Sequence, residues 1–286
     1  MKKTFIILCF LAINVYSQIT DSLKTIKCNS VSHEIDSLQI LAENGDSAAQ
    51  NELTNRYYNG KGVEKDYGKA AYWAKKAAMQ GLAEGQYRLG YCYFLGYGIK
   101  SDTLKAVYWW EKAARQGFAK AQYSYGTAFF YGTGVIKDLE KANFWWEKAA
   151  QQGISEAQYN MGFSYRCGAG LKKDPVIAVY WLEKAAMQGH IKAQSDLGIC
   201  YENGEGTAQD AKKAAYWYEK AAVQGDTLAQ TALGYCYYLG KGVEENHKKA
   251  VYWLEQARKN GSFNAEEELK IIELPLIKEP EDSNEE

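Results

Sequence analysis

Apolar residues recur along this chain in two alternating helical patterns. In the first, a small residue is followed four positions later by a Leu-like residue and eight positions later by an aromatic residue, as in Ala157, Met161 and Tyr165. This spacing puts the apolar side chains on one face of an α-helix. The second pattern is Ala-x-aromatic-Trp followed by Lys-Ala-Ala, and it predicts another helix that ends at a glycine. Together the two patterns predict a helix-turn-helix unit.

The unit repeats with a fixed period of 36 residues and without insertion or deletion. Such a period is the sequence signature of stacked repeats, in which each unit packs only on its neighbours. We therefore predict an all-α solenoid with six full repeats between residues 46 and 261. The glycines that close successive units are Gly45, Gly81, Gly117, Gly153, Gly189, Gly225 and Gly261.

Turn and cap residues fix where the helices begin and end. Each first helix is followed by a Gly-x-Gly turn, because glycine readily takes the positive φ that often follows a helix. Each second helix is preceded by Asp or Asn, whose side chains cap the first turn. Pro175 directly follows Asp174, at the first helical position, where the missing N–H of proline does no harm. The N-caps are Asp66, Asp102, Asp138, Asp174, Asp210 and Asn246.

The two ends of the chain depart from the repeat. Lys2 and Lys3 precede an apolar run over 5–16, which is the layout of a signal peptide cleaved after about Ser17. We expect an exported protein, periplasmic or extracellular, without a transmembrane span in the mature chain; an uncleaved anchor is the alternative. Residues 18–45 are predicted as a flexible lead and an N-terminal capping helix. Residues 262–274 are predicted as a C-terminal capping helix, and 275–286 as a disordered acidic tail.

Charge and reactive residues argue against several classes of function. The formal net charge is −1, and no basic stripe is evident along the repeats, so we expect no nucleic-acid partner. The three histidines lie in different units without metal-ligand spacing, and neither a nucleophile elbow nor a phosphate-binding loop is found. We therefore predict no catalysis, no metal and no cofactor; a hydrolase is the least favoured class.

Cysteine usage does not indicate a disulfide framework. Five cysteines remain after Ser17, which is an odd number. Cys92, Cys200 and Cys236 share one column of the repeat and are predicted to be small buried residues. A bridge between Cys200 and Cys236 is doubtful, because the axes of neighbouring equivalent helices are about 8–10 Å apart.

The repeat resembles the Sel-one-like repeat family, a relative of the tetratricopeptide repeats. The best copies are residues 229–234 (Ala-Gln-Thr-Ala-Leu-Gly), 240–243 (Gly-Lys-Gly-Val) and 249–253 (Lys-Ala-Val-Tyr-Trp). The first unit departs from the pattern, since Thr54 takes the place of the usual glycine. The resemblance implies a right-handed α-solenoid that acts as a scaffold or adaptor, with the first helices lining a concave groove.

Comparing the six copies separates packing positions from candidate binding positions. Columns that never change are predicted to be structural, above all Trp73, Trp109, Trp145, Trp181, Trp217 and Trp253. A stripe of three positions on the first helix varies and supplies aromatic and Arg residues, which are common hot spots of interfaces. We expect the stripe to bind another protein or peptide; the alternatives are cell-wall glycan binding and simple packing on the next repeat. The candidate residues are Tyr87, Tyr91, Phe94, Tyr123, Phe130, Tyr159, Phe163, Arg166, Tyr235 and Tyr238.

Overall fold

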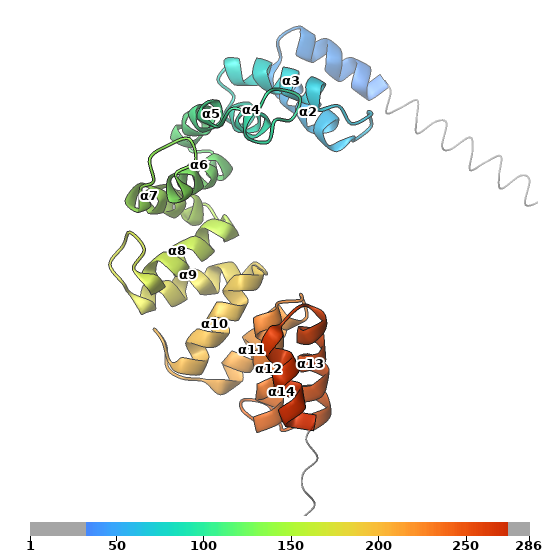
Figure 1. Ribbon diagram of the computed structural model, residues 1–286. Helices are drawn as coiled ribbons and strands as arrows, with labels where there is room; N and C mark the ends of the chain where they lie inside the picture. Colours follow the sequence, from blue (N-terminus) through green and yellow to red (C-terminus); the bar gives the residue numbers. More distant parts are fainter. Residues whose placement is uncertain (1–32, 274–286) are drawn as a thin grey trace, which may run out of the picture. The chain divides into compact units, whose positions relative to one another are not determined.

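The computed structural model describes residues 33–273, which form helices and connecting turns without a β-strand. The signal peptide, most of the flexible lead and the acidic tail predicted above lie outside these residues. Helical residues 33–43 precede the labelled helices of Figure 1. The bounds of those helices are α2 Ser47–Asn59, α3 Tyr67–Met79, α4 Ala83–Leu95, α5 Thr103–Arg115, α6 Ala119–Tyr131, α7 Leu139–Gln151, α8 Ser155–Cys167, α9 Pro175–Met187, α10 Ile191–Asn203, α11 Ala211–Ala222, α12 Thr227–Leu239, α13 His247–Lys259 and α14 Phe263–Glu273.

The chain divides into two compact units, residues 1–121 and 122–286, and the division falls within α6. Each unit is described by itself. Within each, successive helices pair in chain order, so the predicted all-α solenoid of helix-turn-helix repeats is confirmed. None of the helices in the described part of the chain has the length and apolarity that crossing a bilayer requires.

The predicted caps are confirmed in every repeat. The side chains of the six predicted N-cap residues each accept the backbone N–H three residues on, at 2.9 to 3.1 Å. Pro175 occupies the first turn of α9. Both glycines of each Gly-x-Gly turn have positive φ. The second of these glycines also packs tightly: a Cβ on Gly206 would lie 2.1 Å from the carbonyl oxygen of Pro175 in the preceding repeat.

The deepest side chains do not come from the invariant Trp column. Trp73 and Trp181 are buried, but the other four tryptophans of that column are only half-buried. The next position along the second helix is buried in every repeat, and its identity varies. Its occupants are Ala74, Trp110, Trp146, Leu182, Tyr218 and Leu254. The invariant tryptophans therefore pack at the edge of the core, while a variable column fills its centre.

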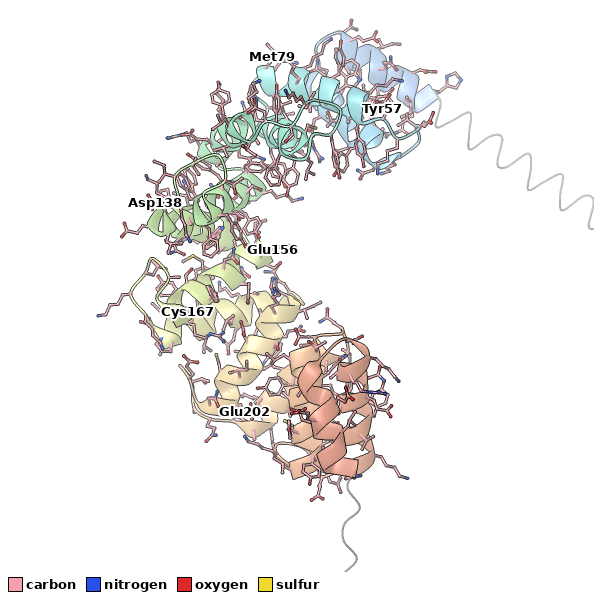
Figure 2. The ribbon with its side chains drawn as sticks, viewed as in Figure 1. Tyr57, Met79, Asp138, Glu156, Cys167 and Glu202 are labelled. Atoms are coloured by element: carbon pink, nitrogen blue, oxygen red, sulfur yellow. The ribbon has the colours of Figure 1, made fainter. Side chains whose placement is uncertain are left out.

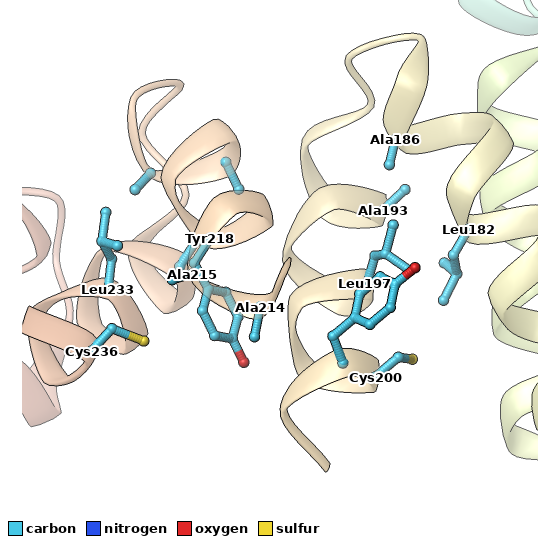
Figure 3. Packing of buried hydrophobic residues seen from close by; sticks show 14 of the residues in the cluster. Leu182, Ala186, Ala193, Leu197, Cys200, Ala214, Ala215, Tyr218, Leu233 and Cys236 are labelled. Atoms are coloured by element: carbon cyan, nitrogen blue, oxygen red, sulfur yellow. The ribbon is translucent and has the colours of Figure 1, made fainter. Parts of the chain in front are cut away.

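Tyr218 shows how that column joins adjacent repeats. Its ring is 1% exposed and belongs to a cluster with Leu197 and Cys200 of α10 and Leu233 and Cys236 of α12 (Figure 3). A Cβ added to Gly198 would lie 2.5 Å from the Tyr218 ring, so only glycine fits opposite so large a side chain. The glycine of the first helix and the large residue of the second helix are thus complementary parts of one packing unit.

A buried glutamine in each first helix provides the polar link between repeats. In five repeats, its side-chain amide donates to a backbone carbonyl eight residues earlier, near the end of the preceding helix, at 2.9 to 3.4 Å. In all six it accepts from the Gln or Asn thirty residues on, at 2.7 to 3.1 Å. The column consists of Gln50, Gln86, Gln122, Gln158, Gln194 and Gln230, each 2 to 5% exposed.

Candidate functional site

In the first unit, the predicted stripe residues form an aromatic cluster on α4. The rings of Tyr87 and Tyr91 are 5.1 Å apart, and Tyr87 lies 5.3 Å from Phe118. Tyr91 and Phe94 lie 5.6 and 5.3 Å from the buried ring of Trp110. These contacts give the rings a packing role, yet Tyr87 and Tyr91 stay half-buried and Phe94 is 38% exposed. The cluster therefore supports the core on one side and meets solvent on the other.

A cavity of about 260 Å³ lies beside this cluster, lined by Tyr58, Tyr87, Tyr91 and Phe118. Arg88 and Lys120 add positive charge at its border. The Arg88 guanidinium is held by Glu84 on the same helix at 2.6 Å, so part of that charge is neutralised. The cavity is aromatic with a basic edge.

In the second unit, Tyr123 and Tyr159 line the same open hollow of about 800 Å³. Tyr159 stacks on His190, with ring centres 4.6 Å apart and planes 20° from parallel. Phe130 lies 5.1 Å from Trp146 and is half-buried. Phe163 is also half-buried. The structure therefore brings Tyr123 and Tyr159 together but places Phe130 against the core.

Arg166 is engaged in an ion pair between repeats. Its guanidinium lies 3.2 Å from the carboxylate of Asp196 on α10, and both side chains are largely shielded. Burial raises the pKa of Asp196, although Arg166 and a hydrogen bond from Tyr159 oppose the rise. Burial, together with Asp196, raises the pKa of Tyr159 to about 12. Arg166 thus holds α8 to α10, and a partner would meet it as a neutralised pair.

Another cavity, of about 560 Å³, lies between α10, α11 and α12. In the sixth repeat, the stripe carries Thr231, which lines the cavity, where the second to fourth repeats carry Tyr87, Tyr123 and Tyr159. Threonine fills less of this space than tyrosine would. The walls are mostly apolar, with the predicted residue Tyr235 at the cavity, and the lining residues are Ile199, Glu202, Tyr218, Thr227, Leu228, Thr231, Ala232, Tyr235, Cys236, Leu239, Lys241 and Ser262.

Glu202, labelled in Figure 2 at the end of α10, is the charged centre of this cavity. Its carboxylate accepts from the Tyr218 hydroxyl at 2.7 Å and from Lys241 Nζ at 2.9 Å. Burial opposes ionisation, but the bonds from Lys241 and Tyr218 outweigh it and lower the pKa of Glu202. The same hydrogen bond and burial raise the pKa of Tyr218. Glu202 is therefore an ionised, already paired acceptor.

The two remaining predicted residues frame the end of the array. Tyr235 is 37% exposed, and burial together with nearby Glu268 raises the pKa of its phenol. Tyr238 is half-buried, packs against the core and lies 6.2 Å from the His247 ring. Tyr235 thus faces the cavity, whereas Tyr238 contributes to packing.

Cys92 and Cys236, which line two of these cavities, are poor nucleophiles. Cys92, Cys167, Cys200 and Cys236 are free thiols. Burial raises the pKa of Cys92 and of Cys236 to about 11, so both stay protonated near neutrality. Among residues 33–273, no three His, Cys, Asp or Glu side chains gather as a metal site would require.

The sequence analysis did not predict the cavity between α10 and α12, because it singled out aromatic residues of the stripe and passed over Thr231, which lines this cavity. The change from Tyr159 to Thr231 in one column was the available signal. It also missed the glutamine column, although that column is without exception in the six repeats.

Helical repeats with hollows along their first helices are typical of scaffold proteins. Similarity to known proteins identifies the family. The Sel1 repeat family model matches six consecutive segments, 47–82, 83–118, 119–154, 155–190, 191–226 and 227–262. The chain belongs to the Sel1 repeat family, whose members generally act as scaffolds for protein interaction. No protein of curated function matches it.

Two solved structures resemble the chain closely. One is a protective antigen present in uropathogenic Escherichia coli strains that displays an SLR fold, with a TM-score of 0.80 and 34% identity over 85% of this chain and 52% of that chain. The other is a Sel1 repeat protein from Oxalobacter formigenes, with a TM-score of 0.72 and 37% identity over 82% of this chain and 68% of that chain. The present chain therefore spans about half the length of the Escherichia coli protein.

Proposed function

We propose that this protein is an exported, non-catalytic scaffold that binds a segment of another protein through a groove lined by its first helices. The observation that carries the proposal is the cavity of about 560 Å³ between α10 and α12. Thr231 lines it at a position where three other repeats carry tyrosine. A repeat that served packing alone would gain nothing from this gap.

The lining of the cavity suits an apolar side chain of a peptide. Ile199, Leu228 and Leu239 supply apolar walls, and Tyr235 supplies an exposed ring. Buried apolar and aromatic anchors carry most of the energy of such interfaces. Glu202 and Lys241 already satisfy one another at 2.9 Å, so a neutral anchor can enter without leaving either charge unpaired.

A photo-crosslinking residue in place of Tyr235 tests the groove in the cells that produce the protein. We expect it to capture a discrete protein, because the side chain stands at the cavity. The matched control carries the same crosslinker in place of Tyr216, a ring that is 50% exposed on a second helix. Equal capture at both positions would contradict a groove on the first helices.

Filling the cavity provides the decisive variant. Thr231→Tyr places in the sixth repeat the residue that α4, α6 and α8 carry at the same position. The fold accepts tyrosine there in three other repeats, so thermal unfolding should change little while capture through Tyr235 is lost. Undiminished capture would exclude the cavity, and recovery of the protein only with insoluble wall material would favour glycan binding.

Export rests on the sequence of residues 1–17 and has its own test. We expect the protein in the periplasmic or extracellular fraction, with an N-terminus at about Gln18 by mass spectrometry. An intact Met1 in a cytoplasmic fraction would contradict it and leave the groove as a separate question.

A further inference from the structure

The second helices expose an aromatic ring at the same position of every repeat. These rings are 48 to 52% exposed. Each lies edge-on to the tryptophan that follows it, with ring centres 4.9 to 5.2 Å apart. The residues are Tyr72, Tyr108, Phe144, Tyr180, Tyr216 and Tyr252.

A lysine accompanies five of the six rings. It lies four residues on, one helical turn away, and its Nζ is 4.7 to 5.3 Å from the ring centre. Large apolar side chains flank the same helices in solvent. Met79 (labelled in Figure 2), Leu104, Val176 and Met187 are 66 to 75% exposed. The exposed face of these helices is therefore aromatic, apolar and cationic together.

The charge of the chain is segregated by helix. The six second helices, α3, α5, α7, α9, α11 and α13, carry sixteen Lys or Arg against six Glu, and the five Asp N-caps that precede them reduce the net charge from +10 to +5. The first helices from α2 to α12 carry five basic and five acidic residues. The overall charge of −1 conceals this excess. Each compact unit has a share: +3 on α3 and α5 with their Asp caps, and +2 on the other four helices with theirs.

We propose that the second-helix face of each unit docks on an anionic lipid bilayer. Tyrosine rings favour the membrane–water interface, where the ring is buried and the hydroxyl stays wet. Lysines extend their charge to lipid phosphates while their stems cover apolar surface. Exposed Met, Leu and Val enter the boundary of the acyl chains. The excess positive charge complements the anionic surface.

The same observations argue against a glycan on this face. A sugar stacks on a free ring face, whereas a lysine Nζ already lies over the ring of Tyr72, Tyr108 and their counterparts. Exposed Met187 and Val176 offer no hydrogen bond to a hydroxyl-rich polymer. At a bilayer, by contrast, the lysines can contact lipid phosphates and the apolar side chains can contact acyl chains.

Vesicle flotation tests the proposal with the protein purified from the producing cells. The probes are phosphatidylcholine vesicles with and without phosphatidylglycerol. We expect binding only to the anionic vesicles. A charge variant with four lysines replaced should bind on the order of several hundredfold more weakly, since each basic side chain near an anionic surface contributes about fivefold. It carries Lys76→Gln, Lys112→Gln, Lys184→Gln and Lys220→Gln.

A matched control removes the same charge elsewhere and should bind within about threefold of the wild type, because exposed charges away from the contact act only through screened, long-range attraction. It carries Lys61→Gln, Lys100→Gln, Lys172→Gln and Lys192→Gln, all exposed and outside the second helices. Both variants share the wild-type N-terminus, so binding through residues 1–17 cancels in the comparison.

A third variant replaces the flanking apolar residues and tests insertion apart from charge. Met79→Ser, Leu104→Ser, Val176→Ser and Met187→Ser alter side chains that are at least 66% exposed, so folding should be preserved. We expect weaker vesicle binding with capture through Tyr235 unchanged. Equal loss in the charge variant and its control, no dependence on phosphatidylglycerol, or association with polysaccharide or with itself instead of vesicles would each overturn the proposal.

Discussion

At the scale of single residues, the fold depends on a size exchange between the two helices of a repeat. Gly90, Gly126, Gly162, Gly198 and Gly234 each face a large side chain from the second helix, and an added Cβ would lie 2.5 to 2.8 Å from it. The first repeat carries Thr54 and Ala74 at the same two positions, and both are buried. The first repeat departs from the glycine pattern in the sequence, but its larger first-helix residue is matched by a smaller second-helix residue.

This size exchange predicts that substitutions at the two positions partly compensate for one another. Gly198→Thr should destabilise the protein by about 1–3 kcal/mol through overpacking against Tyr218. Tyr218→Ala should cost about 3–5 kcal/mol through the cavity it leaves. The double variant reproduces the Thr54–Ala74 pair and should cost less than the sum by about 0.5–3 kcal/mol. Denaturant unfolding of the four proteins measures this coupling; strict additivity would contradict the pairing.

His190 makes one helix start sensitive to pH. Its Nδ1 accepts the Ala193 N–H at 3.2 Å, so the cap needs the neutral imidazole. Burial lowers the pKa of His190, which means that the unfolded chain takes up the proton first as pH falls. The free energy of unfolding should therefore decrease below the ordinary pKa of about 6.5 until the lower folded pKa is reached.

Replacing the histidine separates this contribution from other titrations. His190→Asn keeps a side-chain acceptor, as Asp46 and Asp226 provide at equivalent positions, but does not titrate. Urea unfolding at about pH 7.5 and about pH 5.5 should show a larger loss for the wild type than for the variant. If both proteins lose the same free energy, His190 is not the group responsible.

At the scale of helices, the glutamine column ties each repeat to the next. Gln158 donates to the Ala150 carbonyl at 3.0 Å and accepts from Gln188 at 2.7 Å. Gln158→Ala should cost about 1–3 kcal/mol, because it removes two hydrogen bonds that each contribute about 0.5–1.5 kcal/mol, although the Ala150 carbonyl still accepts from the Gly153 N–H. Gln188→Ala should cost less, since Gln188 lies in solvent and water can replace it. Equal losses of stability in thermal unfolding would mean that the buried Gln158 contributes no more than the exposed Gln188.

The sequence alone was sufficient to predict the helices, because their determinants are local. Caps such as Asp174 and the glycine turns act within a few residues, and the 36-residue period supplied the register. The burial of Tyr218 and the exposure of Tyr216 were not predictable in this way, since both are tyrosines on one helix. The difference in burial between the two tyrosines depends on how α11 packs against α10 and α12. The cavity beside Tyr235 depends on the same packing.

At the scale of the whole molecule, stability in a repeat array is a sum of local terms. The array ends at α14, where Leu269 and Ile272 cover Leu254 of α13. An interior residue such as Trp181 of α9 has repeats on both sides. A substitution at the terminal position should therefore destabilise fewer neighbouring helices than a substitution at the interior position.

Hydrogen exchange resolves that difference. Leu269→Ala removes part of the terminal cover and should speed amide exchange in α13 and α14, while α8 and α9 keep their protection, because α14 packs mainly on α13 and α13 on α12. Trp181→Ala should cost about 3–5 kcal/mol and speed exchange in α8, α9 and α10 together. Loss of protection throughout residues 122–273 in the Leu269 variant would show that this unit unfolds as one cooperative body. In that case the terminal helix would determine the stability of the cavity between α10 and α12, and partner capture through Tyr235 should fall with it.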